Sequence, residues 1–248
     1  MVILKSESEI EIMREAGRIV AECHAMLGEL IKPGVTTIEL DRLVEEKIRA
    51  RGAVPSFKGH HGFTASICTA KNDVICHGFP DSIPLHDGDV ITIDIGANYN
   101  GFHGDSGWTY AVGNVSSDIK DLMTACHQSL FLGIAQAIEG KRLGDIGFAI
   151  DNYAKPLGYG NVREFTGHGI GRELWEEPPV PHYGHQGKGL RLKKGMVLAI
   201  EPMLTLGDSY SYIESDGWTA RTIDHSICVQ FEHTVAITEH GPRILTEL

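Results

Sequence analysis

The sequence predicts an α+β fold, with helices and strands in alternating blocks of one domain that spans residues 1–248. Three observations support this prediction. Apolar side chains recur at helical spacing in the N-terminal segment, two long apolar strands meet at a tight turn, and two more helical segments precede the C-terminal strands. The order of helices, strands, helices and strands suggests two similar halves, although no clear sequence repeat is visible.

The two N-terminal helices are predicted by apolar spacing together with a capping pattern. The first begins after Ser6, which forms a capping box with Glu9, and continues to Leu30. The second covers residues 36–51 and starts with the same pattern of a hydroxyl residue followed three positions later by glutamate. Two later helices are expected at residues 116–138 and 143–155.

Strands are predicted where apolar and β-branched residues run together between turn residues. The clearest pair covers residues 90–97 and 102–112, because the Asn100-Gly101 dipeptide between them favours a tight hairpin turn. The other predicted strands cover residues 67–69, 73–77, 162–166, 196–204, 218–222 and 227–237.

The overall composition excludes several classes of protein. Hydrophobic residues make up 42% and charged residues 22%, which is typical of a globular chain and excludes disorder and coiled coil. A net charge of −11 argues against a dedicated DNA-binding protein. No apolar stretch is long enough for a membrane helix, and no secretion signal is visible at the N-terminus. The five cysteines form no CxxC pair, which indicates reduced thiols, and we expect a cytoplasmic protein.

Three of the predicted strands carry a carboxylate inside an apolar run, at Asp94, Glu201 and Glu232. An ionised carboxylate in such a strand is costly unless a cation neutralises it. The ordinary explanation is an ion pair, but these strands supply no lysine or arginine at a matching interior position. Divalent metal ions explain the pattern better, because one or two ions can neutralise several carboxylates.

Asp105 and two histidines are further candidate ligands. Asp105 follows Asp94 across the predicted hairpin turn, although its Gly-Asp-Ser-Gly context is also typical of a plain turn. His168 lies between two glycines and His77 precedes one, and either could equally be a structural histidine. Carboxylates with a minority of imidazoles suit manganese, iron, cobalt or zinc. Their number exceeds the needs of one ion, which predicts a site with two divalent ions and a hydrolytic reaction.

These residues resemble a known family. In their order and local sequence, five of them resemble the metal ligands of the type I methionine aminopeptidases: Asp94, Asp105, His168, Glu201 and Glu232. The resemblance extends from Ser8 to Leu248 and is closest to the short bacterial form. It implies the pita-bread fold, in which two pseudo-symmetric halves form a curved antiparallel sheet covered by helices. It also implies removal of the initiator methionine from nascent proteins and peptides, with a preference for a small second residue.

The resemblance assigns a role to each ligand. Asp94 chelates one metal ion, Asp105 and Glu232 bridge both ions, and His168 and Glu201 hold the second. A metal-activated water attacks the carbonyl after the first residue, and Glu201 helps to move its proton.

The resemblance also implies a substrate pocket. His77 matches the histidine that contacts the substrate near the scissile bond, and His60 stands where relatives often carry tyrosine. The residues expected to line or border the pocket for the methionine side chain are Phe63, Cys68, Trp218, His61 and Met203. Ordinary core packing is the alternative explanation for the large apolar members of this group.

Trp175 departs from the family pattern, because relatives usually carry a second active-site histidine at this position. That histidine is thought to donate a hydrogen bond to the scissile carbonyl, and an indole has one N–H donor and cannot be protonated. We therefore expect reduced activity. Two alternatives to a methionine aminopeptidase follow: a catalytically weakened binding protein or specialised paralogue, and a proline-specific peptidase, which usually carries an additional N-terminal domain.

A group of basic residues between 188 and 194 stands out in this acidic chain. If the substrate is a growing polypeptide, this loop could contact ribosomal RNA transiently, and the alternative is a solvated loop. We expect a monomer with no membrane and no specific DNA partner.

Overall fold

The computed structural model describes all 248 residues, and its helices and strands alternate in blocks as predicted. The helices are α1 (Glu7–Leu30), α2 (Thr37–Ala50), α3 (Ser117–Ile134) and α4 (Leu143–Ala154), with 3-10 turns at His60–Gly62 and Lys155–Leu157. The strands of the first half are β1 (Val54–Pro55), β2 (Ile67–Lys71), β3 (Val74–Cys76), β4 (Val90–Tyr99) and β5 (Phe102–Ala111). Those of the second half are β6 (Gly160–Asn161), β7 (Gly167–Gly169), β8 (Glu176–Val180), β9 (Val197–Ile200), β10 (Met203–Thr205), β11 (Ser211–Ile213), β12 (Ala220–Thr222), β13 (Cys228–Gln230), β14 (His233–Thr238) and β15 (Gly241–Ile244).

Both predicted capping boxes are present. The Ser6 side chain accepts a hydrogen bond from the Glu9 amide while the Glu9 carboxylate accepts one from the Ser6 amide, and Thr36 and Glu39 form the same pair at α2. These reciprocal bonds satisfy amides that the first turn of a helix leaves without an internal partner. None of the helices combines the length and the apolar character needed to cross a lipid bilayer.

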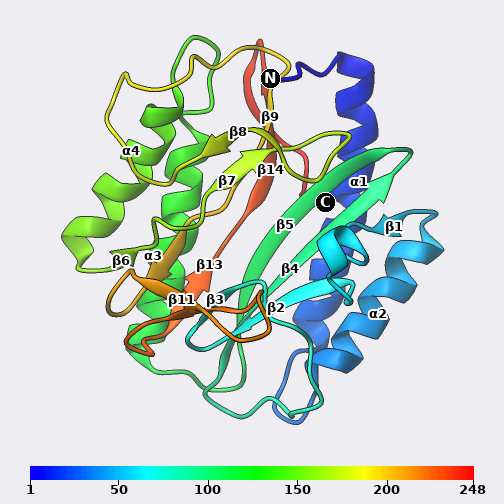
Figure 1. Cartoon of the computed structure of the whole chain (residues 1–248), viewed down its shortest axis with the longest axis vertical. Coiled ribbons are helices and arrows are strands. Elements are labelled where there is room, and N and C mark those ends of the chain that lie inside the picture. Colours follow the sequence, from blue (N-terminus) through cyan, green and yellow to red (C-terminus); the bar gives the residue numbers. More distant parts are fainter.

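The longest strands, β4 and β5, form the predicted hairpin (Figure 1). Tyr99 pairs with Phe102, and the two turn residues Asn100 and Gly101 both have positive φ angles, as a tight hairpin turn requires. Helix α1 packs across this hairpin at Gly17 and Gly104. A Cβ atom added to Gly104 would lie 2.7 Å from the Gly17 nitrogen, so only glycine permits this close approach.

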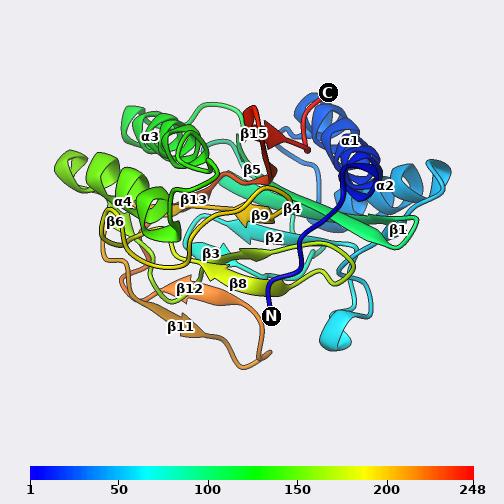
Figure 2. The same cartoon turned by 90° about the horizontal axis from the view of Figure 1, so that it is seen from above.

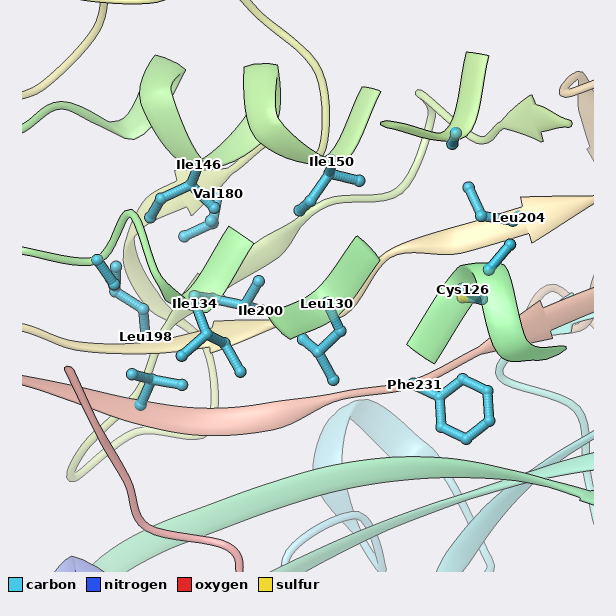
Figure 3. Packing of buried hydrophobic residues seen from close by; sticks show 14 of the residues in the cluster. Cys126, Leu130, Ile134, Ile146, Ile150, Val180, Leu198, Ile200, Leu204 and Phe231 are labelled. Carbon is cyan, nitrogen blue, oxygen red and sulfur yellow. The ribbon is translucent and has the colours of Figure 1, made fainter. Parts of the chain in front are cut away.

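Each half of the molecule has its own hydrophobic core. Helices α1 and α2 pack over the strands around β4, whereas α3 and α4 pack over β9, β13 and β14. Figure 2 shows the two helix pairs at opposite ends of the strand layer. Figure 3 shows side chains of α3 and α4 packed against one another and against Leu198 and Ile200 of β9. The molecule thus has the two-halved arrangement that the sequence predicts.

Hydrogen bonds join the two halves beside the hairpin. The Thr234 hydroxyl on β14 accepts a hydrogen bond from the Asp105 amide on β5 and donates to the Asp105 carbonyl. Strand β14 lies in a five-stranded sheet of order β15-β14-β9-β7-β8, so this pair of bonds connects that sheet to the hairpin. The carboxylate-bearing strands are thereby placed next to one another.

Several predicted boundaries are wrong. The strand expected at 196–204 is divided into β9 and β10, and the strand expected at 227–237 is divided into β13 and β14. The breaks fall at Glu201-Pro202 and at Phe231-Glu232, and Pro202 has no amide hydrogen for a ladder. Residues 162–166 lie between β6 and β7 and are not a strand, and the helix predicted to 138 ends at Ile134. The sequence analysis also missed the short strands β1, β6 and β7 and the strands β8, β11 and β15.

Candidate metal centre

The four carboxylates and His168 converge from different elements of the two halves. Asp94 on β4 pairs with Gly107, and Asp105 on β5 pairs with Gly96, so the two aspartates are diagonal neighbours on one face of the hairpin. Glu201 and Glu232 stand at the strand breaks described above, and His168 is the central residue of β7. The tertiary fold therefore brings together all five candidate ligands.

The His168 ring is oriented for metal binding. Its Nδ1 lies 2.9 Å from the Gly169 carbonyl, which can only accept a hydrogen bond, so Nδ1 carries the proton. The lone pair of Nε2 is therefore directed at the carboxylates, 3.6 Å from Glu201 Oε1 and 3.8 Å from Asp105 Oδ2. Ligand atoms of Asp105, His168 and Glu232 all lie within 4.8 Å of one another.

The protein supplies no cation for these carboxylates. No lysine or arginine forms an ion pair with any of them. Burial raises the pKa of Asp94 to about 7, and burial together with the neighbouring carboxylates raises the pKa values of Asp105, Glu201 and Glu232 well above their usual range. One oxygen each of Asp94, Asp105 and Glu232 is buried without a hydrogen-bond partner. Buried carboxyl oxygens without partners fit divalent cations, because a bound cation favours the ionised form that burial disfavours.

Burial also keeps the His168 ring in the protonation state that binds a metal ion. Loss of solvation lowers the pKa of His168 to about 4, so the imidazole is neutral at physiological pH. A neutral imidazole is a metal ligand, whereas an imidazolium is not.

Gln230 was missed by the sequence analysis. Its buried side-chain Nε2 donates a hydrogen bond to Glu201 Oε2 over 3.2 Å. Its backbone carbonyl accepts a hydrogen bond from the Thr109 hydroxyl. The available signal was a polar residue two positions before Glu232 in an apolar strand, because alternate residues of a strand face the same side.

A cavity of about 430 Å³ opens onto the cluster. Its lining includes all five candidate ligands and six of the predicted substrate residues, namely Phe63, Cys68, His77, Trp175, Met203 and Trp218. His61 lies outside the lining, and its exposed ring stacks against Trp175 at 5.9 Å. His60, which stands where relatives often carry tyrosine, is also in the lining. The lining further contains residues that were not expected there, namely Phe57, Cys76, Phe165, Thr166, Gly167, Glu176, Glu177 and Pro179.

One end of the cavity is an apolar wall. The rings of Phe63 and Trp218 meet edge to face at 5.2 Å, and Phe79 stacks on Phe63 from behind at 4.5 Å. Cys68 is buried in the same hydrophobic cluster, and Met203 is a further buried residue of the lining. This end suits an unbranched apolar side chain.

His77 stands between the apolar wall and the cavity rim. Its ring centroid is 5.8 to 6.2 Å from those of Phe165, Trp175 and Trp218. Burial lowers the pKa of His77 to about 4, which keeps the ring neutral. Its φ of 60° is unusual for a residue with a side chain and directs the ring into the cavity lining.

Trp175 is exposed at the cavity, at 42% of its surface. The His60 ring meets its indole edge to face at 4.6 Å. The indole thus forms part of the cavity rim and packs against imidazoles from the His60–Gly62 turn.

Comparisons with known proteins agree with this geometry. The model of metallopeptidase family M24 matches residues 11–239. Methionine aminopeptidase 1 of Bacillus subtilis (strain 168) is 52% identical over 248 residues, which covers all of both chains. The crystal structure of methionine aminopeptidase from Rickettsia prowazekii superposes with a TM-score of 0.98 at 39% identity and covers 99% of this chain and 100% of that one.

A prolidase from Pyrococcus furiosus is a more distant neighbour. It superposes with a TM-score of 0.81 at 27% identity, and the match covers 99% of this chain but 66% of the prolidase chain. The fold is therefore shared with proline-specific peptidases, whereas full-length similarity is to methionine aminopeptidases. On this evidence the chain belongs to metallopeptidase family M24, has the pita-bread fold, and falls within the methionine aminopeptidase branch of that family.

Proposed function

We propose that this protein is a metal-dependent aminopeptidase that removes the N-terminal methionine from peptides and nascent proteins. The observation that supports this proposal most directly is that one cavity is lined by both candidate metal ligands and large apolar side chains. Its lining contains both the buried carboxylate cluster and the apolar side chains of Phe63, Met203 and Trp218. A methionine side chain placed against the wall brings its own carbonyl towards the cluster.

Two divalent ions suit the ligand set better than one. We propose that Asp94 would help to hold one ion, that His168 and Glu201 would help to hold the second, and that Asp105 and Glu232 would contribute to both. The donor set of four carboxylates and one imidazole suits manganese, iron, cobalt or zinc. When bound, such ions supply Lewis-acid activation of a water molecule and of the substrate carbonyl.

The protein's own residues position the substrate and move the proton. Glu201 lies next to His168 and has a raised pKa, so it can accept a proton at Oε1 or Oε2 and return it to the departing amine. His77 is neutral and can donate one hydrogen bond to the substrate near the scissile bond. Phe63 and Trp218 exclude water from the methionine side chain.

The tryptophan at position 175 favours a second candidate function, that of a catalytically weakened or specialised paralogue. Its indole occupies the rim where the resemblance places a histidine, and it offers one N–H donor without an acceptor. A bulky ring at the rim also favours a small second residue in the substrate.

Further proposals concern the cellular setting. We propose a cytoplasmic monomer in which residues 1–248 act as one catalytic domain. Within the basic loop, Lys194 pairs with Glu7 and Glu239, whereas Lys188, Arg191 and Lys193 form no ion pair. These three free charges support a transient contact with ribosomal RNA.

The deciding experiment measures amino-acid release from the peptide Met-Ala-Ser by purified protein, with and without Mn²⁺ or Co²⁺. We expect metal-dependent release of methionine, no release from an Ala-Pro peptide, and no release by a Glu201→Ala variant. Absence of methionine release by protein that has bound metal would contradict the proposed activity and favour the weakened paralogue.

A further inference from the structure

His182 is a buried residue that the mechanism above does not use. It follows β8, it is 0% exposed, and its side chain makes a single hydrogen bond. That bond runs over 3.1 Å from the backbone amide of Glu201 to His182 Nε2. An amide N–H can only donate, so Nε2 is the acceptor and Nδ1 carries the proton.

The Glu201 amide needs an acceptor from outside the sheet. Strand β9 ends at Ile200, which pairs with His233, and β10 begins only at Met203. The chain therefore leaves the ladder at Glu201, where its buried amide would have no partner. His182 provides that partner and permits the strand break that turns the Glu201 side chain towards the cluster.

The backbone that carries His182 is itself held firmly. The Asn161 side chain donates to the His182 carbonyl over 2.8 Å and to the Asp151 carboxylate on α4 over 2.9 Å. At Gly147 of α4, an added Cβ atom would lie 2.3 Å from the Tyr183 carbonyl oxygen, so the segment lies directly against the helix. The imidazole thus has a fixed position relative to α4.

A merely structural role explains His182 poorly. A buried imidazole loses its hydration, and here it regains one hydrogen bond while Nδ1 remains without a partner. An apolar side chain would fill the same core position without that cost. Its one side-chain hydrogen bond is made to the backbone amide of Glu201, a candidate metal ligand. The histidine is therefore better explained by its effect on the metal site than by core packing.

We propose that His182 is a positioning residue for the metal site: its Nε2 holds the Glu201 backbone and thereby fixes the direction in which the carboxylate enters the cluster. Gln230 holds the same residue at its side chain, so Glu201 is restrained at both ends. This inference rests on the proposed metal-dependent function. Residues that orient metal ligands in this way typically change metal affinity by 10- to 100-fold when they are replaced.

The test is calorimetric titration of Mn²⁺ into metal-free protein, combined with thermal unfolding of the same metal-free samples. We expect His182→Leu, which removes the acceptor and keeps an apolar side chain, to weaken Mn²⁺ binding about 10- to 100-fold. His182→Gln, whose amide oxygen can accept the Glu201 N–H, should stay within about threefold of the parent. Leu40→Ala serves as the matched control, because Leu40 is fully buried in the other half of the molecule.

Leu40→Ala should lower the unfolding temperature and leave Mn²⁺ affinity unchanged, which separates lost stability from lost positioning. An unchanged affinity in His182→Leu, or an equal loss in His182→Leu and His182→Gln, would overturn the proposal. If His182→Leu does not fold, Asn161→Ala takes its place, since it frees the His182 carbonyl, and unchanged affinity there also overturns the proposal. A parent protein that binds no Mn²⁺ would instead contradict the proposed metal site.

Discussion

The side-chain amide of Gln230 donates a hydrogen bond to Glu201 Oε2 over 3.2 Å, and both residues are buried. Gln230 ends β13 and Glu201 follows β9, so the bond spans two different sheets. Because the bond fixes one oxygen of the carboxylate, this amide orients the Glu201 side chain within the cluster. Gln230 is therefore part of the support of the metal site.

We predict that Gln230→Leu lowers kcat/KM for Met-Ala-Ser by about 10- to 100-fold, because Glu201 loses the donor that orients its carboxylate. Steady-state release of methionine at saturating Mn²⁺ measures this effect. Gln186→Leu, which changes an exposed glutamine in the same way, should have no effect. Equal activity in the two variants would show that the Gln230 amide is dispensable.

The carboxylate cluster should destabilise the metal-free protein. Glu232 is buried beside three other carboxylates, so replacing it by neutral glutamine removes repulsion and the cost of burying a charge. We predict that Glu232→Gln raises the unfolding temperature of the metal-free protein at pH 8 and abolishes the further stabilisation that Mn²⁺ gives the parent. For the parent, that gain is about 2.7 kcal/mol at a Mn²⁺ concentration 100 times Kd.

Thermal unfolding with chelator and with Mn²⁺ measures both parts of the prediction. Glu29→Gln, which changes an exposed glutamate, should behave like the parent in both conditions. A lower unfolding temperature for metal-free Glu232→Gln would mean that the cluster is not under electrostatic strain.

The rim residue Trp175 should limit the rate of the reaction. Replacing one hydrogen-bond donor that stabilises a developing oxyanion typically changes the rate by about 10² to 10³. We predict that Trp175→His raises kcat/KM for Met-Ala-Ser by up to about 10²- to 10³-fold. Trp175→Phe, which keeps an aromatic ring without a hydrogen-bond donor, should not raise it. A lower kcat/KM in the Trp175→His variant would refute the view that tryptophan weakens this site.

Acid should destabilise the Mn²⁺-loaded protein through buried histidines, of which His24 lies outside the site. Burial lowers the pKa of His24 to about 4, and its ring nitrogens lie 2.9 Å from the Tyr110 hydroxyl and the Ser106 carbonyl. The unfolded chain takes up this proton near pH 6.5, so stability that is present above pH 6.5 is lost as the pH falls towards 4. The expected loss from this residue is about 3 kcal/mol.

Urea unfolding of the Mn²⁺-loaded protein at pH 7, 6 and 5 measures this slope. His24→Gln, which retains hydrogen-bonding capacity and cannot titrate in this range, should flatten it, and His240→Gln at an exposed position should not. An unchanged slope in His24→Gln would assign the acid sensitivity to other groups.

Elements with local signals could be predicted from the sequence. Capping boxes at Ser6 and Thr36 mark helix starts because their hydrogen bonds span three residues, and Asn100-Gly101 marks a hairpin because both residues accept positive φ. The buried carboxylates were also visible, since a charge in an apolar strand requires a partner wherever the strand lies. These signals were sufficient to indicate a metal site.

The support of the metal site depends on contacts between segments that are distant in the sequence. His182 reaches the Glu201 amide and Gln230 reaches the Glu201 carboxylate through contacts between separate strands, which no local pattern encodes. The same is true of the cavity rim, where the His60–Gly62 turn places His60 in the lining and His61 outside it. Apolar periodicity reports which face of an element is buried, whereas the packing of elements against one another decides which buried polar groups meet.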